Sequence, residues 1–343
     1  MKNDGFYAKH IRPLTRHKVF SLVIILIAMV VLFSIWSNLT GSQFFKASTM
    51  KNILNSIVLS AFLAIGSGCL LLSGNMDLSI AAIGAFGGMI FAVAIEYWGL
   101  HWIVSMLISI VFCALLGAVN ATMITKFRFP AFIATLAMAS MSKGIMFMFS
   151  TIGKGGGSAT NVSVYDQPAL DFIGSGTVGP AKFAVPFGVV VILILFLVYG
   201  VMVAKSKFGM KIMMMGGNPT AATLAGISST KITYILFMNS AILGCLAGVV
   251  QTSRLGQGSL TALQNNQFTG ITAAILGGIS FGGGAGGMGG AFVGLLILNT
   301  FQIGMNTVGV NPFWVNVFSG IILLVALATD FLSQKRLGNL KTA

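Results

Sequence analysis

The residues that could take part in chemistry begin with a glycine-rich stretch, SFGGGAGGMGGAFVG, at residues 280–294. Gly284, Gly286 and Gly289 form a literal G-x-G-x-x-G pattern, which in dinucleotide-binding proteins lets the backbone approach a pyrophosphate. That chemistry also needs a preceding strand, a following helix and an acidic residue about 20 positions later for the ribose. The next acidic residue here is Asp330, and both flanks are apolar. The pattern alone therefore does not predict a nucleotide site.

The cysteine and histidine residues are not arranged for metal binding or nucleophilic catalysis. Cys69, Cys113 and Cys245 all lie in apolar runs and form no C-x-x-C pair, so we expect buried free thiols. The three histidines form neither an H-E-x-x-H motif nor a cluster with carboxylates. We expect no metal site, no catalytic residues and no enzymatic activity in this chain.

One acidic residue inside an apolar stretch needs a physical reason. Asp77 lies in LLLSGNMDLSIAAIG, and an Asp at the centre of a membrane helix costs about 2.5–3.5 kcal/mol. It could hold a break between two helices together or line a polar path. It could also mark a tight turn, with Asn75 and Asp77 as turn formers and Ser79 as the cap of the next helix. The residues leave these alternatives open.

Other polar residues also interrupt the apolar runs. Lys143 is expected to extend its ammonium group towards the membrane surface or to pair with an acid. A spacing of three and four residues places Asn299, Gln302 and Asn306 on one helix face. Contact between helices and a substrate path both explain such a face. The candidate pathway or structural residues are Asp77, Ser79, Asn120, Gln251, Asn299, Gln302 and Asn306.

The overall composition identifies the elements that must position these residues. The 343 residues are 56% hydrophobic and 8% charged, with a mean hydropathy of +0.94. A soluble domain carries about 25% charged residues, so this chain is predicted to be an all-α, polytopic membrane protein. Apolar runs of roughly 20 residues predict about ten spans. We place them near 19–37, 53–73, 79–98, 102–123, 130–150, 183–203, 232–252, 265–281, 287–309 and 312–331. The eighth is short and could be re-entrant, and the first is interpreted as uncleaved.

The distribution of Lys and Arg predicts the orientation. With both termini inside, fourteen of the 20 basic residues fall in inner segments and five in outer ones. The same bias explains the net charge of +14, so nucleic-acid binding is not expected. We interpret residues 1–343 as a single membrane domain with a cytoplasmic N-terminal segment at 1–18, an outer loop at 151–182 and a cytoplasmic loop at 204–231.

The cytoplasmic loop contains a strong helix-start signal. Asn218 is a good cap and Pro219 suits the first helical turn, which predicts a short helix from Pro219 to Ala225 that ends at Gly226. From the residues alone, this helix is either a connector or a contact for a soluble partner. The glycines of the opening stretch are expected to form a tightly packed turn between helices, since small residues let backbones approach closely. The candidate packing residues are Gly277, Gly278, Gly283, Gly286 and Gly290.

Taken together, four segments resemble the membrane permease subunit of ribose-type, binding-protein-dependent ABC sugar importers. They are SGNMDLSIAAIGAFGG (73–88), FPAFIATLAMASMSKG (129–144), MGGNPTAATLAGISSTKITYILF (215–237) and ITAAILGGISFGGGAGGMGGAFVGLLIL (271–298). Their order and spacing are those of the family, over nearly all of the chain after the first span. The chain departs from the usual family pattern at Asn75, Met76, Ala81, Gln267, Thr269 and Ala285.

The resemblance implies a subunit that forms a pathway and hydrolyses no ATP. The implied partners are cytoplasmic ATP-binding subunits, a soluble sugar-binding protein, a second permease copy or paralogue, and the lipid bilayer. No cofactor is expected on this chain, because ATP and Mg²⁺ would sit on the partner subunits. The implied contact with the ATPase comprises Gly216, Gly217, Asn218, Pro219, Ala221, Ala222, Leu224 and Gly226.

Two other functions stay open from the sequence. The same architecture could import a nucleoside or a furanose-like signal molecule instead of a sugar. An ion-driven secondary transporter is a different class, although acids within the spans are few for a proton relay. A membrane enzyme has less support, since no nucleophile, metal or acid–base constellation is present.

Overall fold

The computed structural model describes residues 18–336, apart from 153–157, 165–166, 181–183 and 265. Most of the predicted N-terminal segment and parts of the outer loop therefore lie outside the described residues. Within them, eight helices are long and apolar enough to cross a membrane. They are α3 (Lys18–Leu39), α4 (Ala47–Leu72), α6 (Trp102–Thr125), α7 (Ala131–Ser150), α9 (Phe187–Lys205), α12 (Ser229–Leu255), α14 (Met288–Thr307) and α15 (Pro312–Arg336).

Shorter elements complete the described fold. Helix α5 (Ile80–Glu96) is apolar but has only 17 residues. The remaining helices are α8 (Pro168–Ser175), α10 (Lys207–Gly217), α11 (Pro219–Leu224), the 3-10 helix η3 (Asn266–Phe268) and α13 (Thr269–Leu276). Two antiparallel pairs of two-residue strands join β1 (Val162–Ser163) to β4 (Gln257–Gly258), and β2 (Thr177–Val178) to β3 (Val185–Pro186). The predicted all-α membrane fold is confirmed.

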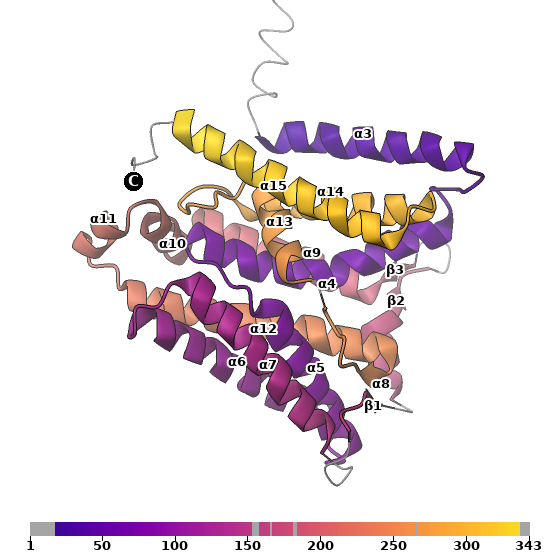
Figure 1. The fold of residues 1–343 in the computed structure, drawn as a ribbon, viewed down its shortest axis with the longest axis horizontal. Coiled ribbons are helices and arrows are strands. Elements are labelled where there is room, and N and C mark those ends of the chain that lie inside the picture. Colours follow the sequence, from indigo (N-terminus) through magenta and orange to yellow (C-terminus); the bar gives the residue numbers. More distant parts are fainter. Residues whose placement is uncertain (1–17, 153–157, 165–166, 181–183, 265, 337–343) are drawn as a thin grey trace, which may run out of the picture.

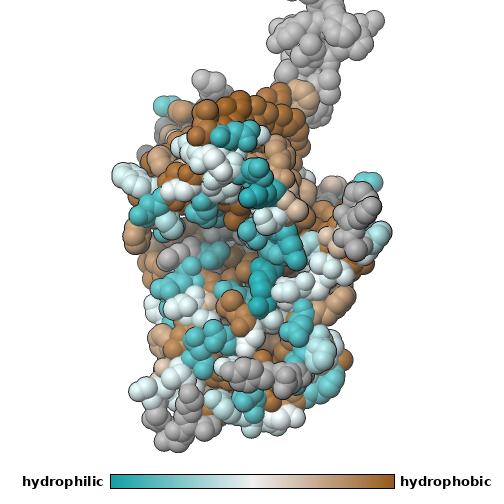
Figure 2. Space-filling view, turned by 90° about the vertical axis from the view of Figure 1, so that its right-hand side faces the viewer, coloured by the Kyte–Doolittle hydropathy of each residue, from teal (hydrophilic) through white to brown (hydrophobic). Residues whose placement is uncertain are grey.

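The helices run side by side between two ends of the molecule (Figure 1). We name the end that carries α10 and α11 the inner end, and the end that carries α8 and the strands β1, β2 and β3 the outer end, following the predicted orientation. Figure 2 faces the outer end, where hydrophilic residues cover much of the centre and the apolar helix α3 forms the upper margin.

The core is built around α5, which is buried from Ile80 to Ile95. Its main neighbour is α12, and the two helices meet through glycines spaced four residues apart. A methyl group added at Gly248 of α12 would lie 1.8 Å from the Gly84 carbonyl oxygen of α5, and one at Gly88 would lie 2.7 Å from the Gly248 oxygen. Only residues without a side chain allow backbones this close within a membrane.

Outer helices instead expose their apolar side chains. Large apolar residues on α3, α6, α7, α9 and α15 remain exposed, such as Ile27, Leu115, Leu197 and Leu324. In a soluble protein such patches would be unstable, but in hydrocarbon they contact lipid tails. This arrangement explains how the chain folds with only 8% charged residues.

The expectation of a full membrane span over 265–281 is wrong, whereas the alternative, a short re-entrant segment, stays a prediction. The observed α13 has eight residues, about 12 Å at 1.5 Å per residue, whereas a hydrocarbon core is about 30 Å thick. Residues 256–264 before it form turns and the short strand β4, and glycines stop the helix at Leu276. A second break lies between α4 and α5, where residues 73–79 are not helical.

Candidate functional site

The short helix α11 stands at the inner end as the sequence predicts (Figure 1). The side chain of Asn218 accepts a hydrogen bond from the Ala221 N–H at 3.0 Å, which confirms the predicted cap. Gly226 follows the helix with a φ of +76°, a conformation that favours glycine. Ala222 faces inward and is fully buried, whereas Leu224 is 86% exposed. The capped helix α11 thus presents an exposed apolar side chain at the inner end.

Next to α11, three backbone segments meet without intervening side chains. The N–H of Gly284 donates a hydrogen bond to the carbonyl oxygen of Leu72 at 2.9 Å, joining the glycine-rich turn to the end of α4. Gly216, at the end of α10, lies against both. A methyl group there would be 2.1 Å from the Leu72 oxygen and 2.6 Å from the Gly284 nitrogen.

Neighbouring glycines extend this contact. A methyl group at Gly283 would lie 2.8 Å from the Gly74 nitrogen, and one at Gly284 would lie 2.5 Å from the Gly217 Cα. Both Gly283 and Gly284 have positive φ angles, +85° and +72°, which the turn requires. We call residues 72–74, 216–217 and 283–284 the glycine junction. It links the base of α11 directly to the break before α5.

The other side of the glycine-rich turn contacts α15. The Phe281 N–H donates to Oδ2 of Asp330 at 3.0 Å, and Nε2 of Gln334 donates to Asp330 and to the Ser280 hydroxyl, both at 2.7 Å. Protein groups thus surround the turn on both sides. The G-x-G-x-x-G pattern is therefore explained by packing between helices, without a nucleotide.

The predicted packing glycines have distinct environments. A methyl group at Gly290 would lie 2.0 Å from the Gly277 carbonyl oxygen, so these two residues set the spacing of α13 and α14. Gly278 and Gly286 adopt φ angles of +88° and +116° in the connection between the two helices. Together with Gly283, these residues form a turn that larger side chains would disrupt.

Asp77 lies in the break between α4 and α5 and is 1% exposed. Its Oδ1 accepts hydrogen bonds from the backbone N–H of Ser79, at 2.8 Å, and from the Ser79 hydroxyl. Oδ2 accepts from the Ser240 hydroxyl of α12 at 2.7 Å. The Ser79 hydroxyl in turn accepts from Nδ2 of Asn120 on α6 at 2.9 Å. We call Asp77, Ser79, Asn120 and Ser240 the Asp77 network.

The Asp77 network joins three helices at the point where the chain is not helical. The prediction that the Ser79 side chain caps α5 is wrong, because its hydroxyl is directed to Asp77 and makes no cap hydrogen bond. A short turn-forming carboxylate satisfied by hydroxyl donors fixes the start of α5 against α6 and α12. This geometry matches the expectation that Asp77 holds a broken-helix connection together. A pathway role for these residues stays a prediction.

The remaining polar candidates are separated in the structure. Gln251 accepts a hydrogen bond from the Leu263 N–H at 3.1 Å and so holds the non-helical segment before α13. Asn299 is buried and accepts from the Ser60 hydroxyl of α4 at 3.4 Å, while Gln302 donates to Ser319 of α15 at 3.4 Å. Asn306 is exposed. Asn299 and Gln302 thus contact different helices, although the spacing placed them on one face.

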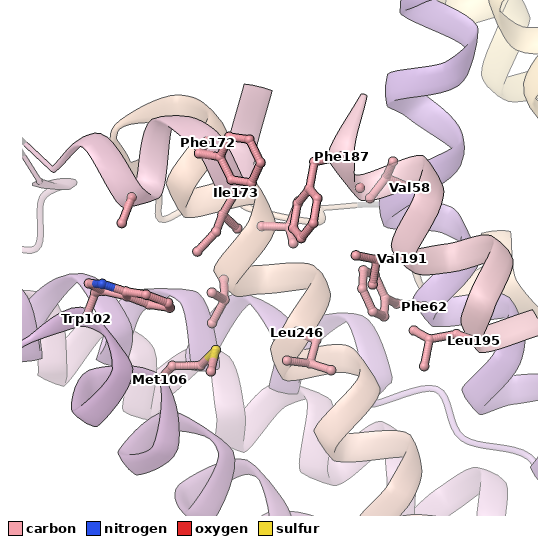
Figure 3. Close-up of a pocket in the computed structure, with 14 residues that line it drawn as sticks. Val58, Phe62, Trp102, Met106, Phe172, Ile173, Phe187, Val191, Leu195 and Leu246 are labelled. Carbon is pink, nitrogen blue, oxygen red and sulfur yellow. The ribbon is translucent and has the colours of Figure 1, made fainter. Parts of the chain in front are cut away.

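An apolar cavity of about 500 Å³ lies among α4, α6, α8, α9 and α12 (Figure 3). Figure 3 shows Phe172 and Phe187 above it and Trp102, Met106 and Leu246 below. This lining offers hydroxyl groups almost no hydrogen-bond partners. The cavity therefore does not suit a polar solute.

Comparison with known proteins identifies the family. The family model described as the permease component of branched-chain amino acid transport systems matches residues 49–327. The chain belongs to this permease family. The ribose import permease of Escherichia coli K12 is 31% identical to the permease over 307 residues, which cover 89% of this chain and 92% of that protein. The fructose import permease of Rhizobium meliloti is 30% identical over 90% of this chain and 84% of its own length.

Other relatives extend the same picture. The xylose transport permease of Haemophilus influenzae is 27% identical over 92% of this chain and 97% of that protein. No solved structure matches the permease. Membership of this family, with the apolar helices, shows a multi-pass inner-membrane transport component that is itself not catalytic. The resemblance to sugar importers is thus confirmed.

Several polar residues that join helices in the structure were not predicted from the sequence. Ser240, Asp330 and Gln334 make contacts that join distant helices. Ser240 is a small polar residue in an apolar helix and carries no signal, whereas Asp330 and Gln334 are four residues apart on α15, a spacing that places them on one helix face. The pairs Gly84–Gly88 and Gly244–Gly248 did carry a signal, because their four-residue spacing is typical of close helix contacts.

Proposed function

We propose that the permease lines the pathway of an ATP-driven importer for a monosaccharide. The observation that carries the proposal is similarity to ribose, fructose and xylose permeases over nearly the whole chain. The family description names branched-chain amino acids, but the three relatives just named are described as sugar permeases. The relatives therefore favour a sugar over an amino acid.

In this proposal the permease has three kinds of protein partner. Cytoplasmic ATPase subunits carry ATP and Mg²⁺ and dock on α11, where the exposed Leu224 offers an apolar contact. A soluble sugar-binding protein docks on the outer end, whose hydrophilic surface is visible in Figure 2. A second permease, either a copy or a paralogue, completes the pathway within the bilayer.

The proposed mechanism uses two conformations of the pathway. Closure of the ATPase subunits around nucleotide displaces α11. This displacement can shift the equilibrium between the two pathway conformations only through contacts that differ between them. The glycine junction supplies such a contact, because Gly216 is packed against Leu72, five residues before Asp77. Motion of α11 then repositions the non-helical start of α5.

The test is uptake by membrane vesicles of cells that produce the complex. Labelled D-ribose, D-fructose and D-xylose are supplied, with a nucleoside and leucine as competitors. We expect uptake of one sugar that stops on ATP depletion, persists with an ionophore and resists competition by leucine. Uptake that survives ATP depletion and collapses with an ionophore would instead establish the ion-driven alternative. Competition by the nucleoside alone would identify a nucleoside as the transported solute and would leave the importer architecture as proposed.

A further inference from the structure

A small cavity with both polar and apolar lining residues lies beside the start of α5 and the non-helical segment before α13. Its volume is about 190 Å³. One wall consists of Ala81, Ala82 and Ala85 in the first two turns of α5, and another of Lys143 and Phe147 on α7. The third wall is the segment before α13, with the polar residues Thr261, Gln264 and Gln267.

Lys143 occupies an unusual depth for a charged residue. It is the thirteenth of the 20 residues of α7, about 18 Å from the inner end of the helix and about 10 Å from the outer end. A charged side chain at such a depth faces protein or a water-filled cavity far more often than lipid. In the described part of the chain it forms no ion pair, and its neighbours in the cavity include two amide side chains.

The polar wall is held in place by specific contacts. The Leu263 N–H donates to Gln251, and the Leu260 N–H donates to Oδ1 of Asn161 at 3.0 Å. Leu263 itself has a φ of +51°, a conformation that is uncommon for a non-glycine residue and needs surrounding support. Non-helical backbone at membrane depth is tolerated only where protein covers it or where it lines a water-filled cavity.

We propose that this cavity is a subsite for a neutral, polyhydroxylated solute on its way through the permease. The inference rests on the proposed function and deepens it. Lys143 supplies hydrogen-bond donors, while the hydroxyl of Thr261 and the amides of Gln264 and Gln267 can both donate and accept. Sugar hydroxyls have the same dual character. Phe147 and the three alanines offer apolar surface to the C–H groups of a sugar ring.

Discontinuous membrane segments often form solute sites near the middle of a bilayer, because their unpaired polar groups and side chains converge there. In this permease one break precedes α5 and a second precedes α13. The alanines at the start of α5 and residues 260–264 of the second break line the same cavity. Thr261 and Gln264 are exposed on the surface of this chain. The cavity thus opens away from the core, on a face that a second permease can close.

The first experiment compares uptake by cavity variants with uptake by matched variants elsewhere. Lys143→Met and Gln267→Leu are paired with Lys51→Met and Gln43→Leu, whose parent residues are exposed outside the cavity. With the complex saturated by sugar-loaded binding protein, we expect each cavity variant to lower maximal uptake of the transported sugar about tenfold, the scale of one lost charged or well-placed hydrogen bond. The matched variants keep uptake within about twofold of the original chain. Equal uptake by all four variants would overturn the proposal.

The second experiment asks whether the cavity contains water, independently of sugar uptake. Gln264→Cys is exposed to a charged, membrane-impermeant thiol reagent, with Met141→Cys on the opposite, exposed side of α7 as the control. The three native cysteines are buried, so background labelling is low. We expect labelling of Gln264→Cys only, slowed by D-ribose, D-fructose or D-xylose in the assembled complex.

The outcomes separate the two proposals. A complex without ATP-driven sugar uptake contradicts the proposed function, whatever the labelling shows. Failure of Gln264→Cys to react, or reaction no faster than that of Met141→Cys, overturns the cavity as a water-filled subsite. Labelling that none of the three sugars slows overturns the assignment to a polyhydroxylated solute.

Discussion

At the scale of single residues, Asp77 shows how this permease accommodates a carboxylate in an apolar core. Its oxygens are occupied by the Ser79 amide, the Ser79 hydroxyl and the Ser240 hydroxyl. Among the described residues, Oδ1 of Asn120 has no hydrogen-bond partner, so the pairing of the network is complete at the carboxylate and not at Asn120. Inside a protein, each paired polar group stabilises the structure and each unpaired one costs free energy. The paired carboxylate therefore fixes one geometry for the start of α5.

The Asp77 network predicts a measurable coupling between two helices. Ser240→Ala removes one donor and is expected to destabilise the purified permease by about 0.5–1.5 kcal/mol. Asp77→Ala leaves the Ser79 and Ser240 donors unpaired and should cost about 2–4 kcal/mol. A double-mutant cycle, followed by thermal unfolding in detergent, is expected to give a coupling energy of about 0.5 kcal/mol or more. Strictly additive losses would contradict the hydrogen bond between these residues.

Single residues also mark the limit of prediction from sequence. Asp77 is recognisable because an acid among apolar residues is costly wherever it lies. Its partners are not, since Ser240 and Asn120 are small polar residues that apolar helices carry for many reasons. Only the folded chain brings residues 163 positions apart, Asp77 and Ser240, into contact.

At the scale of elements, the glycine junction joins α4, α10 and the turn before α14 through backbone contacts. Gly216 and Gly217 are adjacent, yet their surroundings differ greatly. A methyl group at Gly216 meets backbone atoms at 2.1 and 2.6 Å, whereas the nearest atom to one at Gly217 is 3.7 Å away. The difference makes the two positions a matched pair.

Gly216→Ala is expected to push the three backbone segments of the glycine junction apart. The added methyl group would clash with backbone atoms, which cannot rotate away as a side chain can. Such overpacking costs about 1–3 kcal/mol, and we expect sugar-stimulated ATP hydrolysis by the complex to fall at least fivefold. Gly217→Ala, whose methyl group meets no atom closer than 3.7 Å, leaves the junction packed and should lower this stimulation much less than Gly216→Ala does. The measurement is ATPase activity of the reconstituted complex with and without the sugar-loaded binding protein. Equal stimulation in both variants would contradict coupling through the junction.

A second matched pair tests the packing of α13 on α14. Gly290→Ala would place a methyl group 2.0 Å from the Gly277 oxygen and is expected to destabilise the permease by about 1–3 kcal/mol. Gly289→Ala has no heavy atom within 4 Å of the added methyl group and should be neutral, or stabilising by about 0.5 kcal/mol through helix propensity. The measurement is the unfolding temperature of the two variants, determined side by side. An identical loss in the two variants would mean that the helices are not in contact there.

Elements differ in how far the sequence predicts them. The long apolar helices follow from composition and length, and the α11 helix follows from its Asn218 and Pro219 start signal. The helix over 265–281 was wrong because apolar character does not distinguish a continuous helix from a short one. Glycines end the observed helix at Leu276, and contacts from Gln251 and Asn161 hold the non-helical segment before it.

At the scale of the whole molecule, the central claim is that α11 docks on an ATPase and transmits its motion to the pathway. Leu224 is 86% exposed at the inner end, and Leu39 is 82% exposed near the outer end of α3. The two residues have the same side chain and nearly the same exposure. They differ in the end of the molecule on which they lie, so one serves as the control for the other.

The measurement that tests this claim most directly is site-specific cross-linking in native membranes. A photoreactive amino acid replaces Leu224 in one variant and Leu39 in another, and adducts are purified in mild detergent and identified by mass spectrometry. The account predicts that the ATPase subunit forms an adduct at position 224 and not at position 39. A complex that retains its ATPase but forms no adduct at 224, or forms one equally at 39, would contradict docking on α11.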